Sequence, residues 1–361
     1  MGLLLDKVLF NYFLELLILC FILIHNIKYN LYPIKSFFSN KIWSKWFIFL
    51  LLLTLCGLIF GIPNFNFKFL SALILSSAFS SVMNLNRELE YNGLKLFVLG
   101  MTLYALFFYL GFFSSNFSFS KGRLYLFEEN PNSLSTRVAI SIFISFFLFL
   151  KSKKYIQKFI YFVPIIILAP FLLLFGSKGS FLIVGIAVIL YFLLYGDLKF
   201  TRKIFLILIT FFIFLRYIFD SLVESTVGQR FLQDGDDLGT RNTLWEIAFN
   251  KIFLKYPMGV GETRYFQLME MEFGTALDTH NLFLYILVTS GFIGLIIFIL
   301  PLFTLMKGHF KLYLKFKEPF YLVLLLFLFL LMSKTGGILS YLIMWYFIAF
   351  IHSNLNSKKN A

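Results

Sequence analysis

Long apolar runs joined by short polar connections follow one another along the chain. The runs are continuous and do not alternate at every second residue, which is typical of membrane-crossing helices and not of barrel strands. Each is close to the ~20 residues that a helix needs to cross a bilayer. We count eleven, within a range of 10–12, over residues 8–25, 46–62, 67–83, 94–114, 134–150, 159–175, 180–195, 203–219, 281–305, 319–333 and 336–352. The pattern predicts an all-α polytopic integral membrane protein, with residues 1–361 forming a single transmembrane domain.

One long connection, residues 220–280, interrupts this pattern. It contains an amphipathic segment that begins at Arg241 and ends before Pro257, which stops the predicted helix. The apolar residues of the segment recur at helical spacing and are Leu244, Trp245, Ala248, Phe249, Ile252, Phe253 and Tyr256. His280 then stands at the start of the ninth apolar run. An arginine and a histidine lie at the two ends of one excursion out of the bilayer, and we interpret this excursion as the active site.

Composition supports the membrane class and excludes a soluble domain. The chain is 60% hydrophobic and only 14% charged, and its mean hydropathy is +0.85. The net charge of +14 would suit a nucleic-acid-binding protein, but the bases lie in alternate connections, so we predict no nucleic-acid partner. The basic connections hold Lys28, Lys35, Lys41, Lys45, Arg87, Lys95, Lys151, Lys153, Lys154, Lys158, Lys199, Arg202, Lys203, Lys307, Lys311, Lys315, Lys317, Lys358 and Lys359. The positive-inside rule places these connections and the C-terminus in the cytoplasm, and the N-terminus and the 220–280 loop outside.

Arginine is distributed differently from lysine. Six of the eight arginines lie on or near the predicted outer side, and these are Arg123, Arg137, Arg216, Arg230, Arg241 and Arg264. The planar guanidinium binds phosphate through two parallel hydrogen bonds, which a lysine cannot do. The set therefore indicates an anionic, phosphate-bearing ligand on the outer side. For any one arginine, ordinary pairing with the acids of the loop is an equally good interpretation.

Two further side chains are candidates for chemistry. His280 is the only histidine of four on the predicted outer side, and an imidazole can accept a proton near neutral pH. Its alternative role is to cap the ninth helix. Lys178 lies at the tip of a hairpin, Gly176 to Ser180, where a cation would face lipid phosphates. Its alternative role is that of a snorkelling lysine.

Several other features indicate little specific chemistry. Asp234-Gly235-Asp236-Asp237 has the look of a metal-binding pair, but we favour a solvated acidic turn and predict no metal and no cofactor. Cys20 and Cys56 fall within apolar runs and suit packing. Glu15 lies inside the first run and is a functional candidate by default.

Five short motifs in order carry a family resemblance. They are Asn130-Pro131-Asn132, Gly176-Ser177-Lys178-Gly179, Arg241-x-x-x-Trp245, Pro257-x-Gly259-x-Gly261, and His280-Asn281-x-x-Leu284 with Gly291 and Gly294. Over residues 130–300 the chain resembles the O-antigen polymerase and O-antigen ligase family. The resemblance implies about a dozen spans, one large periplasmic loop and a place in the bacterial inner membrane. It also implies metal-independent, inverting transfer of glycans carried on undecaprenyl pyrophosphate. The family's hairpin carries Ser-Arg-Gly, whereas this chain has Ser177-Lys178-Gly179 and keeps the charge without the guanidinium fork.

From these residues and this resemblance we expect an O-antigen polymerase that joins lipid-linked repeat units. Arg241, Lys178 and Arg264 would bind the pyrophosphate, and His280 would take the proton of the attacking hydroxyl. Expected partners are the lipid-linked glycan, the bilayer and a chain-length regulator protein. The alternatives are a ligase that transfers the glycan to lipid A-core and a flippase or transporter. The transporter is less favoured because few charged residues lie inside the runs and no internal repeat is visible.

Overall fold

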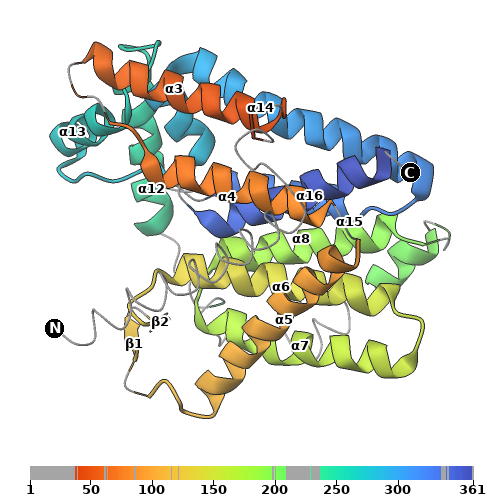
Figure 1. Cartoon of the computed structure of the whole chain (residues 1–361). Helices are drawn as coiled ribbons and strands as arrows, with labels where there is room; N and C mark the ends of the chain where they lie inside the picture. Colours follow the sequence, from red (N-terminus) through yellow and green to blue (C-terminus); the bar gives the residue numbers. More distant parts are fainter. Residues whose placement is uncertain are drawn as a thin grey trace. The chain divides into compact units, whose positions relative to one another are not determined.

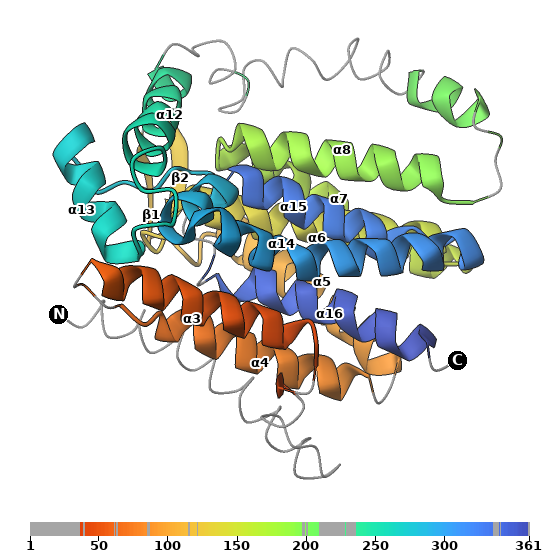
Figure 2. The ribbon, with the colours of Figure 1, turned by 90° about the horizontal axis from the view of Figure 1, so that it is seen from above.

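The computed structural model describes residues 37–359 apart from positions 39, 61, 63, 85–86, 115, 121, 197–198, 200, 209–227, 229–235, 335–338 and 340. The described residues are mostly helical (Figures 1 and 2). The chain divides into two compact units, which we describe separately. The first comprises Met1–Arg87, Asp237–Lys311 and Met332–Ala361, and the second comprises Glu88–Asp236 and Leu312–Leu331.

The helices and strands fall into these units with a few crossing a boundary. The first unit holds α3 (Trp43–Ile59), α4 (Phe67–Met83), α12 (Asp236–Glu246), the π-helix η1 (Ile247–Phe253), α13 (Glu262–Phe273), most of α14 (Leu282–Phe316) and α16 (Leu342–Lys359). The second holds nearly all of α5 (Arg87–Tyr109), β1 (Phe117–Ser120), β2 (Arg123–Leu126), α6 (Pro131–Lys151), α7 (Tyr155–Leu174), α8 (Lys178–Leu194) and most of α15 (Phe320–Lys334).

Polar caps explain where several of these helices begin. The side chain of Asn66 accepts a hydrogen bond from the backbone N–H of Phe69 and so starts α4. Asn130 accepts from the backbone N–H of Asn132, with Pro131 in the first turn of α6. The Asn130-Pro131 motif is therefore helix punctuation, as its composition predicts.

Aromatic side chains fill the core of the first unit. Trp46 packs edge-on against Trp345 with ring centroids 4.9 Å apart, and its indole N–H donates to the carbonyl of Phe298 at 3.1 Å. Helix α4 packs against both α3 and α16 (Figure 2). This core packs α3, α4, α14 and α16 together, and polar segments adjoin the N-terminal end of α14.

The second unit is built around α6, which packs against both α7 and α8 (Figure 1). Phe147 of α6 stacks on Phe320 with ring centroids 3.7 Å apart, and Tyr191 of α8 packs against both rings. One element here corrects the all-α prediction, because β1 and β2 form an antiparallel hairpin with Ser120 opposite Arg123. The first strand alternates apolar and polar residues from Phe117 to Ser120, the period-two pattern of a strand, and Gly122 stands in the turn before the second.

The membrane class is supported by helix length and surface character. Four described helices are long and apolar enough to cross a membrane, over Glu88–Tyr109, Pro131–Lys151, Tyr155–Leu174 and Leu282–Phe316, and four shorter helices are also apolar. On α7 the side chains of Ile156 and Phe159 are 64% and 63% exposed, as expected for a surface that faces lipid. The predicted span 8–25 and most of the span 203–219 lie outside the described residues. The count of eleven spans and the single transmembrane domain stay predictions.

Candidate active site

The helix that carries Arg241 differs in detail from its prediction. It begins at Asp236 and ends at Phe253, and its second half is a π-helix and not a continuation of the α-helix. Leu244, Ala248 and Ile252 are buried as the apolar spacing predicts. Trp245 and Phe249, placed on the same face by that spacing, are instead 37% and 41% exposed. Phe249 lies in the π-helix, whose wider turn rotates side chains away from an ideal helical period. Trp245 precedes the π-helix, and its indole is instead bonded to the Thr279 carbonyl.

Trp245 joins this helix to the segment that contains His280. Its indole N–H donates to the carbonyl of Thr279 at 2.7 Å. Arg241 precedes Trp245 by four residues, so both lie on one face of α12. The Arg241-x-x-x-Trp245 motif thus carries its arginine on the helix face that contacts the residue before His280.

His280 is held in an unusual conformation by Asp278. The backbone of His280 has φ = 50°, a left-handed value that costs a non-glycine residue free energy. One oxygen of Asp278 accepts a hydrogen bond from the backbone N–H of His280 at 2.7 Å, and the same oxygen lies 3.1 Å from Nδ1 of the His280 ring. A carboxylate this close to Nδ1 favours the tautomer with its proton on Nδ1, in which Nε2 carries the lone pair and can accept a proton. The side chain of His280 is 41% exposed, so the imidazole ring is accessible from outside.

The residue after His280 caps the longest described helix. Asn281 accepts hydrogen bonds from the backbone N–H groups of Phe283 and Leu284, at 3.1 and 3.2 Å. Capping was the alternative role for His280, and the structure gives that role to its neighbour. Among the described histidines, His309 and His352 are buried, whereas His280 is not.

The glycines of the Pro257-x-Gly259-x-Gly261 motif fit a break in α14. Gly291 has φ = 68° and ψ = −174°, so the helix is interrupted there. The carbonyls of Val288 and Thr289 accept hydrogen bonds from the backbone N–H groups of Val260 and Gly261, at 3.2 and 2.8 Å. A Cβ on Gly259 would lie 2.5 Å from the backbone nitrogen of Gly291. The loop and the helix break are therefore complementary backbone surfaces that satisfy carbonyls the helix leaves unpaired.

A buried carboxylate fixes α13 beside this break. Glu262 is 9% exposed and accepts hydrogen bonds from Tyr285 Oη at 2.8 Å and from Asn66 Nδ2 at 3.1 and 3.2 Å. Burial raises the pKa of Glu262, and the hydrogen bonds from Tyr285 and Asn66 lower it in part. Tyr265 donates from its hydroxyl to the carbonyl of Leu277 at 3.0 Å, and its pKa is raised by burial and by Asp278. These contacts hold the chain on either side of His280.

The two predicted phosphate-binding arginines of this unit have no acidic partner among the described residues. Arg241 makes no ion pair or side-chain hydrogen bond within that part of the chain. Arg264, on α13, donates only to the side-chain oxygen of Gln267 at 3.2 Å there. The carboxylates of Asp278 and Glu262 already accept bonds from other groups, so the positive charges are available to an anion.

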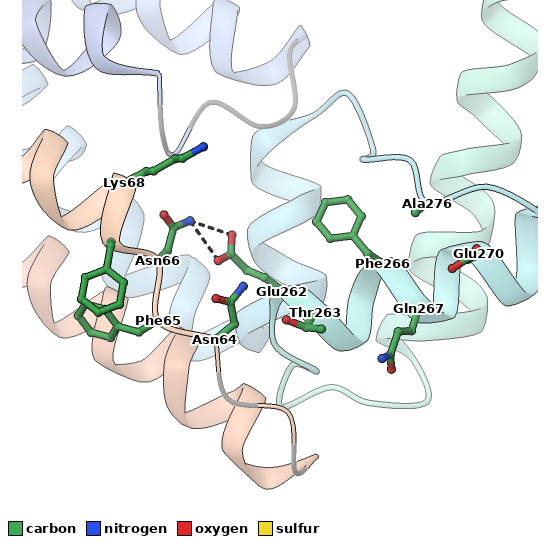
Figure 3. A pocket seen from close by; sticks show the side chains of 11 residues that line it. Asn64, Phe65, Asn66, Lys68, Glu262, Thr263, Phe266, Gln267, Glu270 and Ala276 are labelled. Carbon is green, nitrogen blue, oxygen red and sulfur yellow. Dashed lines mark hydrogen bonds between the residues drawn. The ribbon is translucent and has the colours of Figure 1, made fainter. Parts of the chain in front are cut away.

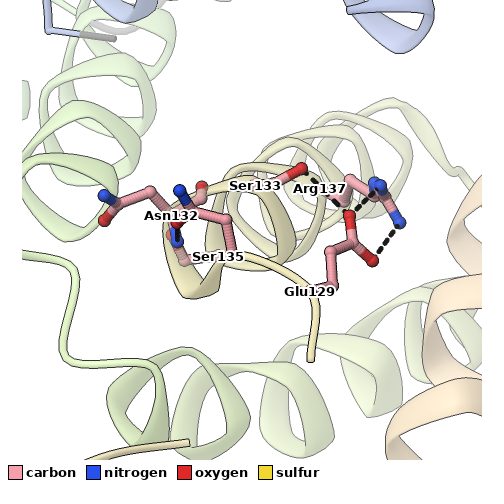
Figure 4. A network of polar contacts seen from close by, with 6 residues as sticks. Glu129, Asn132, Ser133, Ser135 and Arg137 are labelled. Atoms are coloured by element: carbon pink, nitrogen blue, oxygen red, sulfur yellow. Dashed lines mark hydrogen bonds and ion pairs between the residues drawn. The ribbon is translucent and has the colours of Figure 1, made fainter. Parts of the chain in front are cut away.

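Lys178, Arg123 and Arg137 belong to the second unit. Lys178 is the first residue of α8, after Gly176 with φ = 61°, which confirms the predicted hairpin tip. Arg123 donates to the carbonyl of Phe175 at 3.0 Å and to Asn132 at 2.7 Å, so it ties β2 to that hairpin and to α6. Arg137 donates to both carboxylate oxygens of Glu129, which also accepts from Ser133 (Figure 4).

Other predicted features remain untested. Arg216, Arg230 and Glu15 lie outside the described residues, as do Asp234 and Gly235 of the acidic turn. Within the described ranges there is no group of three or more side chains suited to hold a metal ion. Cys56 is buried in α3, where its thiol contacts the carbonyl of Met258 at 3.3 Å, a packing role.

Sequence reasoning missed the residues that orient the site. Asp278 could have been found from its place two residues before His280, because aspartate readily bonds the backbone two residues onward. Glu262, Asn66 and Tyr285 come from three distant segments and show no common signal in the sequence. Their contact depends on how α4, α13 and α14 pack.

The apolar helices define a helical membrane protein. The polar cluster at the N-terminal end of α14 is its candidate active site and lies outside the apolar core. Residues 163–299 of the chain match a family model described as O-antigen ligase. The match confirms the resemblance to the O-antigen polymerase and ligase family, whose members are glycosyltransferase-like enzymes. It covers Lys178, Arg241, Arg264 and His280. No curated protein matches the chain.

Proposed function

We propose that this protein is an O-antigen polymerase. It would join undecaprenyl-pyrophosphate-linked repeat units at the periplasmic face of the bacterial inner membrane, by metal-independent, inverting glycosyl transfer. One observation carries the proposal: an arginine without an acidic partner in the described chain lies on the helix face that is bonded to the segment of an oriented, exposed histidine. The arginine suits an anionic leaving group, and the histidine suits the proton of an attacking hydroxyl.

The proposed reaction balances on named atoms. A sugar hydroxyl attacks the anomeric carbon of the donor, a C–O bond forms, and the bond from that carbon to the pyrophosphate oxygen breaks. The electron pair leaves with the lipid pyrophosphate, and the proton of the hydroxyl goes to Nε2 of His280. The carboxylate of Asp278, 3.1 Å from Nδ1, supports this step because it favours the tautomer that leaves Nε2 free to accept the proton. Arg241 and Arg264 stabilise the charge that develops on the pyrophosphate.

Lys178 is the other proposed pyrophosphate contact. A cation at the first position of a helix is unfavourable beside the positive end of the helix dipole, by about 0.3–1 kcal/mol. An anion bound at the start of α8 would reverse this effect and would be attracted by the backbone N–H groups as well. This argument rests on the position of Lys178 in α8 alone.

The proposed orientation follows from charge. The basic connections, including the C-terminal Lys358 and Lys359, would face the cytoplasm, and the 220–280 loop would face the periplasm. The exposed Trp245 and Phe249 beside buried Leu244 suit a helix that lies along the membrane surface. A chain-length regulator is the expected protein partner.

A ligase is the second candidate, because the family model that matches is described by that activity. Both enzymes need the same donor chemistry, so the site alone does not separate them. Glycan analysis of cells that lack the protein does. A single repeat unit still attached to core supports the polymerase, and long chains stranded on lipid pyrophosphate with bare core support the ligase. No change in either pool would contradict both and favour a flippase or transporter.

A further inference from the structure

An open pocket of about 560 Å³ lies within the first unit, between residues 64–68 and one side of α13 (Figure 3). Its volume falls in the range of about 300–1,000 Å³ that is common for small-molecule sites. Figure 3 shows side chains from the segment before α4 and from its first turn on one side, and from α13 on the other. The proposed mechanism does not use this pocket.

The pocket does not have the charge of a phosphate site. Its charged lining residues are Lys68, Glu262 and Glu270, so carboxylates outnumber the single cation. Glu262 is already bonded to Asn66 and Tyr285, whereas Glu270 is exposed. The lining residues themselves therefore offer little net positive charge for a pyrophosphate, whereas a neutral ligand needs none.

The polar groups of the pocket match hydroxyl groups. The amides of Asn64 and Gln267 can each donate and accept, which is what a hydroxyl also does. The oxygen of Gln267 accepts from Arg264, which leaves the amide nitrogen to donate. Glu270 can only accept as a carboxylate, and Lys68 can only donate. Such a mixture of donors and acceptors suits a ligand that carries many hydroxyls.

Phe266 adds an apolar surface to this polar lining. Its ring packs against Tyr265 and Tyr285, with centroid distances of 5.1 and 6.1 Å, so it is held in place from behind. An aromatic face suits the C–H face of a pyranose, because both are apolar and flat. Amides, a carboxylate and a supported ring together are the chemistry of a carbohydrate site.

The pocket is joined to the candidate active site by direct contacts. Glu262, at the start of α13, bonds Tyr285 in the first turns of α14, the helix that begins two residues after His280. Arg264, a proposed pyrophosphate ligand, is bonded to Gln267 of the pocket. These two bonds place the pocket on the same helices, α13 and the start of α14, that carry Arg264 and adjoin His280.

We propose that this pocket is an oligosaccharide subsite that binds sugar residues of the lipid-linked glycan. The inference rests on the proposed function and deepens it, since it separates recognition of the sugars from recognition of the pyrophosphate. The sugars could belong to the donor or to the acceptor, which share the same chemistry.

Binding of a free repeat-unit oligosaccharide, without lipid or pyrophosphate, to the full chain in nanodiscs tests the subsite. Gln267→Ala and Glu270→Ala together should raise the Kd at least about fivefold, because two exposed hydrogen-bonding groups are lost. Glu272→Ala is the matched control, since Glu272 is also exposed on α13 but pairs with Lys251 and does not line the pocket. Equal Kd values for the double variant and the control would overturn the proposal.

Glycan joining in the same nanodiscs separates this inference from the proposed function. The double variant should raise the KM for a glycan substrate with little change in kcat. Arg241→Ala should lower the rate of joining by about 10²–10³-fold while oligosaccharide binding persists. Competition by the free oligosaccharide against the donor or against the acceptor identifies the source of the sugars. If the double variant is active and its KM equals that of the wild type, the subsite proposal is wrong and the polymerase proposal stands. If the wild-type protein binds the oligosaccharide but joins no glycans, the polymerase proposal is wrong and the subsite proposal stands.

Discussion

The arginines of the two units differ in their bonding partners. In the second unit Arg137 is paired with Glu129 (Figure 4). Arg123 is bonded to Asn132 and to the carbonyl of Phe175. In the first unit the carboxylates of Asp278 and Glu262 serve other groups, and Arg241 has no acidic partner in the described chain. A paired cation is explained by structure alone, whereas a cation left beside an oriented histidine indicates a ligand. From this comparison we predict a structural role for Arg123 and Arg137 and a functional role for Arg241.

The largest effect should come from the first unit. Arg241→Ala should lower the rate of glycan joining by about 10²–10³-fold, through loss of charge stabilisation at the leaving pyrophosphate. His280→Ala should lower it by about 10²–10⁴-fold, through loss of the proton acceptor. Glycan ladders from cells that express each variant at the wild-type level measure both effects. A normal ladder would remove that residue from the mechanism.

A second large effect should come from the loop that fits the break in α14. Gly259→Ala places a Cβ 2.5 Å from the nitrogen of Gly291, in a backbone with φ = 89°. We expect a loss of roughly 1–3 kcal/mol from backbone strain and a similar loss from overpacking. Thermal unfolding in detergent measures it, with Gly185→Ala as the control because no atom lies within 4 Å of that added Cβ. Equal Tm values for the two variants would show that the close contact between Gly259 and Gly291 does not limit the stability of the protein.

Asp278→Asn should have an intermediate effect on activity. The amide still accepts the backbone N–H of His280 but orients the imidazole less well, so we expect a fall in kcat of about 10-fold or more with little change in Tm. Rates measured with saturating glycan in proteoliposomes test this. Unchanged kcat would mean that the 3.1 Å contact between Asp278 and His280 does not matter for proton transfer.

Arg137→Gln sharpens the comparison from the other side. The Arg137–Glu129 pair is about one-third exposed on each side, so its loss should cost at most about 1 kcal/mol of stability. Activity per folded molecule should stay at the wild-type level. A loss of joining as great as that of Arg241→Ala, in protein that is still folded, would place Arg137 among the functional arginines.

The smallest effect should be a pH dependence of stability from Glu262. Its pKa is raised in the folded protein above the ordinary value of 4.5, so the folded state binds the proton more tightly than the unfolded state. The free energy of unfolding should therefore fall as the pH rises from about 4.5 through the folded pKa. Glu262→Gln should flatten this part of the curve of Tm against pH, whereas Glu272→Gln should not. Parallel curves for wild type and Glu262→Gln would contradict the assignment.

Much of the architecture is visible in the sequence because apolar length and polar caps act locally. The helices α4, α6, α7 and α8 lie close to the predicted spans, and the hairpin tip at Gly176 is where two apolar runs meet. The hairpin of β1 and β2 was missed although its alternation is local. The π-helix at Ile247 could not be predicted, because its turn depends on tertiary packing.

The candidate site likewise has residues that the sequence indicates locally and others that depend on tertiary packing. Arg241, Lys178, Arg264 and His280 stand out by residue type and position, and the family match covers all four. Asp278 is close in sequence to His280 and could be inferred from its spacing. The cluster of Asn66, Glu262 and Tyr285, and the fit of Gly259 to Gly291, depend on segments far apart in the chain. Spacing along a sequence carries no information on such contacts.

The most direct test of the central claim uses the pure protein in proteoliposomes that contain lipid-linked repeat units. We predict that the wild-type protein forms a ladder of joined repeats on lipid pyrophosphate, and that folded His280→Ala and Arg241→Ala form none. Transfer of repeat units across the bilayer without joining would contradict the claim and indicate a flippase. Equal ladders from wild type and both variants would show that the chemistry lies elsewhere in the chain.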